Sequence, residues 1–309
     1  TEFDIDVRII QAYHCRLEKD GFRSLDILGQ SRTKVNGSPA KRVVELHGTG
    51  SDLTRGNAIK IPERKHMSRI VALRLIDVAE KKGRPEKIIK SYWNMYYCLD
   101  EVRTVGNTLY GNYCRSRMCT VCIANHKAEL INKYLPVIKK WKDAHFLTLT
   151  IPAIPASKLN SYMQDLMIRG MKKIIEKYRK PYERGKGKKL MGVRSLECCF
   201  NPISRTYNPH FHLIVPDRET AVILKREWLL LWKKVKPAPW CQKIRKVGDT
   251  ERDMKETIKY GTKIFTDPTV KKFKGKASPY VYISAMDNIL VAMRGKRLFE
   301  HFGFKVPKQ

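Results

Sequence analysis

The sequence predicts an α+β protein built on a central, mostly antiparallel β-sheet with helices packed against it. From residue 125 onward, segments with helical periodicity and segments of alternating apolar and polar residues follow one another in a β-α-β-β-α-β order. The two middle strands are joined by Asn-Pro-Ile-Ser-Arg at residues 201–205, a composition typical of a hairpin turn. Hydrophobic residues make up 42% of the chain, which excludes a purely disordered basic tail.

The N-terminal part, residues 1–94, is expected to be partly helical. Residues 29–60 are rich in Gly, Ser, Thr and Asn, which is typical of a loop or linker. Helices are expected at residues 66–82 and 85–98, the second opened by a proline. This helix pair is a candidate helix-turn-helix DNA reader. It has no distinctive turn, so a small packed helical subdomain with an accessory DNA-binding or interaction role is favoured.

The elements of the second part each depend on a local pattern. Residues 145–151 alternate apolar and polar side chains and end at a proline. Residues 157–180 place Leu159, Met163 and Ile174 on one helical stripe. Further helices are expected at residues 125–142, 217–235, 250–265 and 278–302, the last of them basic, and further strands at residues 191–200, 207–215 and 240–247.

The chain is strongly basic, with 62 Lys and Arg residues against 30 Asp and Glu residues and a formal net charge of +32. Residues 1–124 carry a net +8 and residues 125–309 a net +24. Charge of this size favours a polyanionic partner, nucleic acid first and an anionic membrane surface as the alternative. No run of about 18 apolar residues is present to span a bilayer, and the first residues lack the pattern of a secretory signal. We therefore expect a cytoplasmic protein with no membrane partner.

Eight cysteines without a secretory signal favour reduced thiols or metal ligands over disulfides. Four of them cluster in residues 95–126: Cys98, Cys114, Cys119 and Cys122. Four thiolates separated by short polar segments suit a tetrahedral Zn²⁺ site, which is structural when all four positions are filled. His126 is a substitute ligand in this interpretation, and scattered buried cysteines are the alternative to a zinc site.

A second group of ligands is expected on the strand at residues 207–215. His210 and His212 project to the same face of that strand, while Phe211 faces a core. Two imidazoles on one face form half of a divalent-cation site, and Glu197 on the preceding strand could complete a three-ligand set. Two solvated histidines are the alternative.

A third group is expected on the helix at residues 250–265, where three functional side chains share one face: Glu256, Tyr260 and Lys263. A free tyrosine has a pKa of about 10, so a nucleophilic Tyr260 requires a metal-polarised target and a nearby cation to hold the phenolate. Core packing of this tyrosine is the alternative.

Basic residues near these motifs are candidates for contacts with nucleic-acid phosphates, with Trp and Tyr side chains available to stack unpaired bases. They are Arg184, Lys186, Lys188 and Lys189 in one loop, Lys259 beside Tyr260, and Lys271, Lys272, Lys274 and Lys276 in a second loop. Solvated, disordered loops are the alternative for both runs.

Together these motifs resemble the plasmid rolling-circle replication initiators of the HUH endonuclease superfamily, over residues 95–265. The branch is the one with a single nucleophilic tyrosine and a glutamate four residues before it, here Tyr260 and Glu256. Phe-Leu-Thr-Leu-Thr at residues 146–150 resembles the first motif of the family, and Pro-His-Phe-His at residues 209–212 resembles the second. The cysteine cluster resembles the one that precedes the nuclease core in this branch.

The resemblance implies a ferredoxin- or RRM-like HUH nuclease core at residues 127–309. It also implies that Mg²⁺ or Mn²⁺ is bound by His210, His212 and an acidic residue on the neighbouring strand, at the position of Glu197. Asn208 departs from the pattern, because this branch often has another histidine there, and the departure shifts weight to Glu197 as the third ligand.

The resemblance further implies a catalytic cycle. Tyr260 attacks a DNA phosphate, forms a 5′-phosphotyrosine and releases a 3′-OH that a polymerase extends. Lys263 lowers the cost of the phenolate, and Glu256 activates a water at the end of the cycle. The implied partners are an origin with single-stranded or hairpin character and a host helicase and polymerase in the bacterial cytoplasm, with an oligomer left open.

Two other functions fit parts of the sequence. A transposase or relaxase of the same superfamily would use the same chemistry on another target. Relaxases usually have three clustered histidines, and only two occur here. Many large HUH transposases use a tyrosine pair at helical spacing, and the helix expected at residues 250–265 has only Tyr260. A non-catalytic, zinc-containing nucleic-acid-binding protein explains the charge and the cysteines, but it leaves the ordered histidine and tyrosine motifs without a role.

Overall fold

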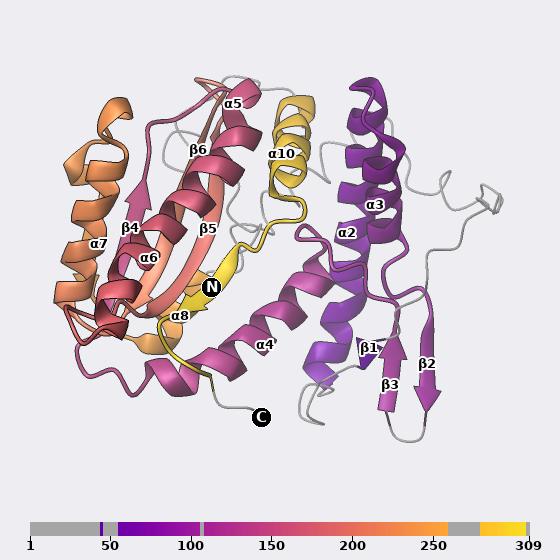
Figure 1. The fold of residues 1–309 in the computed structure, drawn as a ribbon. Helices are drawn as coiled ribbons and strands as arrows, with labels where there is room; N and C mark the ends of the chain where they lie inside the picture. The colour runs from indigo at the N-terminus through magenta and orange to yellow at the C-terminus, as the bar shows by residue number, and fades with distance from the viewer. Residues whose placement is uncertain (1–43, 46–54, 106–107, 259–278, 307–309) are drawn as a thin grey trace, which may run out of the picture. The chain divides into compact units, whose positions relative to one another are not determined.

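The computed structural model describes residues 44–45, 55–105, 108–258 and 279–306 (Figure 1). The chain divides into two compact units, Thr1–Cys122 and Ile123–Gln309. The predicted three-part division, with boundaries after residues 94 and 126, stays a prediction.

The first unit combines a helix pair with a small sheet. Helix α2 (Arg55–Lys81) packs against α3 (Glu86–Tyr96), whose start is set by Pro85 at φ −54°. The sheet is antiparallel and has the order β1-β3-β2, with β1 at Val44–Glu45, β2 at Val102–Val105 and β3 at Thr108–Gly111.

Two features of the first unit differ from the sequence-based expectation. The predicted loop at residues 29–60 is wrong for residues 55–60, which form the first turns of α2. Gly56 and Asn57 favour a loop, but they fall in the first turn of the helix. The backbone N–H groups of that turn make no intrahelical hydrogen bonds, so poor helix formers are tolerated there. The β2–β3 pair was not predicted, although Gly106-Asn107 between two runs of strand formers is a hairpin signal.

The second unit is built on a five-stranded sheet in which every pair of neighbours is antiparallel. Its order is β7-β4-β6-β5-β8, with β4 at His145–Thr150, β5 at Gly192–Asn201, β6 at Thr206–Val215, β7 at Lys243–Lys246 and β8 at Phe299–Phe302. The predicted antiparallel sheet, its β-α-β-β-α-β order and its central hairpin are therefore confirmed.

One face of this sheet is covered by α6 and α7, which lie side by side (Figure 1). Helix α4 (Thr120–Ile138) begins just before the boundary between the units. The other helical elements of the second unit are α5 at Ala156–Ser161, the π-helical turn η1 at Tyr162–Ile168, α6 at Arg169–Glu183, α7 at Arg218–Leu231, α8 at Thr250–Thr257 and α10 at Pro279–Met293. Trp228 of α7 is fully buried, packs edge-on against Phe211 of β6 and donates its indole N–H to the Thr150 carbonyl at 3.0 Å. Phe211 thus faces the core, as its strand pattern predicted.

The predicted basic helix at residues 278–302 is wrong in its extent and in its charge. Helix α10 ends at Met293 and contains no Lys or Arg, and residues 299–302 form β8 at the sheet edge. Gly295 adopts φ +69°, a left-handed conformation that ends the helix, and the cations that suggested a basic helix lie in the connection that follows. Phe299 and Phe302 are buried in β8, so the burial of these two rings favours a strand over a continued helix.

No helix in the part of the chain that the structure describes is long and apolar enough to cross a membrane.

We expect Trp228→Ala to lower the free energy of unfolding by about 3–5 kcal/mol, because it empties the space between α7 and the sheet. Trp240→Ala is the matched control, since Trp240 is 80% exposed and its loss should change stability by no more than about 0.5 kcal/mol. Urea unfolding followed by circular dichroism measures both variants. Equal effects of the two substitutions would contradict this account of the core.

Candidate functional site

The register of the sheet brings Glu197, His210 and His212 together on the face opposite to α6 and α7. In the β5–β6 hairpin Glu197 pairs with His210 and Ser195 with His212, and in the β4–β6 pair Thr148 lies opposite His212. One ligand atom from each of Glu197, His210 and His212 lies within 4.8 Å of the others. The group that the alternation of β6 predicted is therefore assembled by strand pairing.

The two histidines turn the same ring atom toward the carboxylate. Oε2 of Glu197 lies 3.7 Å from Nε2 of His210 and 3.7 Å from Nε2 of His212. The other ring nitrogens are engaged elsewhere. His210 Nδ1 is 3.0 Å from the Asn208 carbonyl oxygen, and His212 Nδ1 is 3.2 Å from Oγ1 of Thr148. Such contacts fix ring orientation and tautomer in metal sites, so two imidazole nitrogens and one carboxylate oxygen fit a divalent cation here.

Asn208 does not belong to this ligand group. Its side-chain oxygen accepts a hydrogen bond from the Thr150 hydroxyl at 3.0 Å, and its amide donates to the Ile151 carbonyl at 3.0 Å. Its side chain thus ties β6 to the end of β4, while its main-chain carbonyl contacts His210. Asn208 therefore has a structural role, and Glu197 takes the third position of the ligand group.

Helix α8 is anchored on the same face of the sheet by an ion pair that was not predicted. Asp253 of α8 is 1% exposed and binds Arg245 of β7 through both carboxylate oxygens, one contact being 2.7 Å. The Arg245 guanidinium lies 4.4 Å from the centroid of the Phe146 ring, and that ring is 5.3 Å from the ring of His212. The contact with Asp253, followed by the charge of Glu256, raises the pKa of Arg245.

The start and end of α8 are both defined. Asp249 caps the helix by accepting hydrogen bonds from the N–H groups of Glu251 and Arg252, at 2.9 and 3.1 Å. The predicted helix at residues 250–265 is thus confirmed only as far as Thr257, and Ile258, which follows the helix, is fully buried. Glu256 is half-buried on this helix. The predicted nucleophile Tyr260 and the predicted cations Lys259 and Lys263 lie outside the described residues.

The four predicted zinc ligands form a second cluster, within the first unit. The sulfur atoms of Cys98, Cys114, Cys119 and Cys122 all lie within 4.8 Å of one another. Backbone N–H groups point at two of them: Arg115 donates to Cys122 at 3.3 Å and Ser116 donates to Cys114 at 3.4 Å. Hydrogen bonds from the thiols of Cys114, Cys122 and Cys98 hold the pKa of Cys119 well below its ordinary value.

This sulfur cluster fits a structural Zn²⁺ site. Its four soft donors fill a tetrahedral set, and N–H donors of the kind described stabilise thiolates. His126, the predicted substitute ligand, instead places its Nδ1 3.3 Å from the Glu129 carboxylate on an exposed part of α4. The four-cysteine set is thus sufficient without it.

The predicted phosphate-binding loop contains one cation with a different role. Lys188 contacts the carboxylates of Asp217 and Glu219 at 2.7 and 2.5 Å, and Asp217 caps α7. Lys188 therefore anchors the loop to the start of α7, while Arg184 and Lys186 are exposed. Lys189 is also exposed, and its ammonium lies 5.4 Å from the centroid of the Tyr182 ring. The second predicted basic run, Lys271, Lys272, Lys274 and Lys276, is not among the residues that the structure describes.

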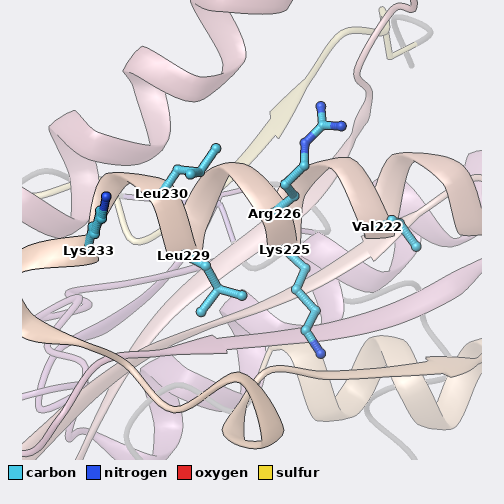
Figure 2. A pocket seen from close by; sticks show the side chains of 6 residues that line it. All are labelled: Val222, Lys225, Arg226, Leu229, Leu230 and Lys233. Atoms are coloured by element: carbon cyan, nitrogen blue, oxygen red, sulfur yellow. The ribbon is translucent and has the colours of Figure 1, made fainter.

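A shallow hollow of about 490 Å³ lies on the outer side of α7 and is unrelated to the ligand groups. Figure 2 shows the side chains that line it, which come from one side of α7 and from the short turn after it: Val222, Lys225, Arg226, Leu229, Leu230 and Lys233. Helix α7 covers the Phe211 face of the sheet, whereas His210 and His212 lie on the opposite face. The hollow is therefore not the candidate active site.

Comparison with known proteins identifies the family. A family model described as replication protein matches residues 107–303, more than half of the chain. The chain belongs to this replication protein family. The match includes three of the four clustered cysteines and all five strands of the second sheet, and it leaves residues 1–106 outside.

Several relatives share the name "Protein rep". The one from Staphylococcus aureus is 32% identical over 172 residues, which are 49% of this chain and 70% of that protein. The one from Streptococcus pneumoniae serotype 2 is 25% identical over 224 residues, 63% of this chain and 66% of that protein. The one from Bacillus sp is 26% identical over 132 residues, 40% of this chain, and the match spans 41% of that protein's length. No solved structure matches the chain significantly.

We expect the protein to co-purify with about one zinc ion per chain and Cys119→Ser to reduce this to near none, because a tetrahedral set loses one of its four thiolates. Elemental analysis by mass spectrometry measures the metal content. Cys241→Ser is the matched control, since Cys241 is exposed and lies outside the cluster. Zinc loss in the control, or zinc retained in Cys119→Ser, would contradict the assignment.

We expect His210→Ala combined with His212→Ala to weaken Mn²⁺ binding by at least about tenfold, because both imidazole donors are removed. Titration calorimetry on zinc-loaded protein measures the affinity, and His126→Ala is the control, since its exposed ring pairs with Glu129. Unchanged Mn²⁺ affinity in the double variant would show that the three-residue group does not hold the cation.

Proposed function

We propose that this chain is a plasmid replication initiator that nicks one DNA strand at an origin, with Tyr260 as the nucleophile and with dependence on a divalent cation. The observation that carries the proposal is the group of Glu197, His210 and His212 on the sheet face where α8 is anchored. Ile258 is buried and is the last residue that the structure describes in this segment. Tyr260 comes two positions later in the sequence. Membership of the replication protein family supports the same reaction class.

The metal ligands set the position of the reacting phosphate. A divalent cation bound by His210, His212 and Glu197 would withdraw negative charge from a non-bridging oxygen of that phosphate, where the transition state accumulates it. The role of the protein is to hold these three donors rigidly, and it does so on adjacent strands in the interior of a sheet. The Nδ1 contacts with Asn208 and Thr148 keep both imidazoles turned toward the carboxylate.

The proposed chemistry exchanges one phosphodiester for another. The Tyr260 phenolic oxygen forms a bond to phosphorus, the bond from phosphorus to the 3′ oxygen breaks, and the leaving 3′ oxygen ends with the proton that the phenol lost. The DNA 5′ end is then joined to Tyr260 and a 3′-OH is available as a primer. The bond broken and the bond formed are of the same type, so the step is reversible and the same site can rejoin strands. Lys263, three residues further on, is proposed to lower the cost of the phenolate.

Glu256 is proposed to act at the end of the cycle. With a single predicted nucleophilic tyrosine, the cycle needs another group to end it, and a carboxylate that removes a proton from water supplies the second nucleophile. The half-buried position of Glu256 and its electrostatic interaction with Arg245 support a placement near the reacting groups.

The basic residues are proposed to hold the DNA. Arg184, Lys186 and Lys189 are exposed on the loop that precedes β5, and their charges suit phosphate contacts. Lys259 and the run Lys271, Lys272, Lys274 and Lys276 are proposed for the same role on sequence grounds. Extension of the 3′-OH would require a host polymerase, and strand separation a host helicase.

We expect Tyr260→Phe to abolish a covalent protein–DNA adduct that the unmodified protein forms. The protein is incubated with Mn²⁺ and single-stranded oligonucleotides tiled across the DNA that flanks its gene, and adducts are detected on denaturing gels. Tyr280→Phe is the matched control, since Tyr280 is a half-exposed tyrosine on α10. An adduct that survives in Tyr260→Phe would exclude this nucleophile. No adduct with any oligonucleotide from the unmodified protein would favour the non-catalytic alternative.

The same assay separates the role of Glu256 from that of Tyr260. Glu256→Gln should form the adduct at a normal rate but release it slowly, so adduct accumulates. Equal loss of adduct formation and release would remove the proposed role of Glu256 in termination.

A further inference from the structure

Three aromatic side chains at the C-terminal end of α3, two within the helix and one on the residue that follows it, lie away from its packed face. That packed face consists of Ile88, Tyr92 and Met95, which are all buried. Trp93, Tyr96 and Tyr97 occupy the remaining circumference, and their rings contact one another. The aromatic group is therefore not needed to fill the core of the first unit.

The rings form a small platform with a defined geometry. Those of Trp93 and Tyr97 are stacked, with centroids 5.9 Å apart and planes 22° apart. Tyr96 meets both of them edge-on, at 5.7 Å from Trp93 and 5.0 Å from Tyr97. The guanidinium of Arg69, on α2, lies 5.3 Å from the centroid of Tyr96. An aromatic pair with nearly parallel planes, within a ring group that also holds a cation, has the geometry on which a planar base stacks.

Part of the platform is open to solvent. Tyr97 is 51% exposed and Trp93 is half-buried. Lys90 and Asn94 are exposed and share their side of the helix, because positions 90, 93, 94 and 97 fall on one stripe of an α-helix. The stripe thus combines two aromatic faces with a cation and an amide, one helical turn apart, which suits a ligand that is planar and anionic at the same time.

The end of the platform is held in place by the chain that follows it. Cys98 comes directly after Tyr97 and its sulfur lies 3.5 Å from that of Cys122. Asp100 accepts contacts from Lys65 and Arg69 of α2, both at 2.7 Å. The rings are therefore positioned before any ligand arrives, and a pre-positioned platform loses little conformational entropy on binding.

We propose that Trp93 and Tyr97 bind unpaired bases of single-stranded DNA by stacking, with Lys90 contacting the adjacent phosphate. The choice of DNA as the nucleic acid depends on the proposed function, whereas the recognition of an unpaired base depends only on the rings and charges of α3. Duplex DNA does not fit as well, because its bases are already stacked and their faces are covered. This surface lies in residues 86–97, before the segment matched by the family model, and it adds a nucleic-acid contact to the first unit.

The test uses the full-length, zinc-loaded protein and a fluorescent oligothymidylate of about 12 nucleotides, long enough for one stacking site and its flanking phosphates. Fluorescence anisotropy at fixed salt, with no added divalent cation, gives the affinity. We expect Trp93→Leu combined with Tyr97→Leu to weaken binding by about 10-fold or more. Trp93→Phe combined with Tyr97→Phe keeps both rings and should bind within about threefold of the unmodified protein.

Three controls make the result specific. Trp240→Leu removes an exposed tryptophan of the second unit and should leave the affinity unchanged. An abasic oligonucleotide of the same length carries the phosphates without the bases. The double variant with Trp93→Leu and Tyr97→Leu, the leucine pair, should bind it as tightly as the unmodified protein does. Zinc content and circular dichroism of the leucine pair should match those of the unmodified protein. If the leucine pair is misfolded, the phenylalanine pair and the cross-linking below decide.

Photo-cross-linking with 5-iododeoxyuridine locates the base directly. Mass spectrometry should find the cross-link on the peptide that contains Trp93 and Tyr97, and its absence from that peptide would overturn the proposal. An unchanged oligothymidylate affinity in the folded leucine pair, or an equal loss on the abasic strand, would overturn it as well. Stronger binding of the RNA counterpart, oligouridylate, would overturn the choice of DNA. None of these measurements requires strand cleavage, so a failure of the nicking hypothesis is recorded separately.

Discussion

The antiparallel register between β4, β5 and β6 is the constraint on which the candidate site depends. It places Glu197 opposite His210 and Thr148 opposite His212. A slip of one residue would turn both imidazoles toward α7, because the side chains of a strand alternate between its faces. The packing of Phe211 against Trp228 prevents that slip. The core on one face and the ligands on the other are thus two results of one pairing.

Local patterns in the sequence were enough to predict the sheet, the cysteine cluster and the histidine pair. They failed where the partner is distant along the chain. The contact between Thr148 and His212 joins residues 64 positions apart, and Lys188 meets Asp217 across 29 positions. β8 was assigned to a helix because its burial comes from β5, more than 90 residues earlier. The roles of Tyr260 and Lys263 remain predictions, since no described contact bears on them.

The two ligand groups differ in chemistry in a way that separates their metals. Four thiolates prefer a soft ion such as Zn²⁺ and leave no open position for a substrate. Two imidazoles and one carboxylate offer a mixed, harder set with fewer protein donors, which leaves room for oxygen ligands from outside the protein. A protein with both groups can keep a structural ion while its other site exchanges cations with the solvent.

Strand β7 has a consequence for how copies of this protein behave in concentrated solution. Among the residues that the structure describes it forms one edge of the sheet, and its sequence Lys-Ile-Arg-Lys contains three cations in four residues, at Lys243, Arg245 and Lys246. An unpaired edge is a template for β-pairing with another molecule, and such pairing leads to aggregation. Here the edge is four residues long and carries Lys243 and Lys246 beside the Arg245–Asp253 ion pair, so two copies that approach through it bring lysines of like charge together. The same charge that suits a polyanionic ligand thus also opposes self-association of the sheets.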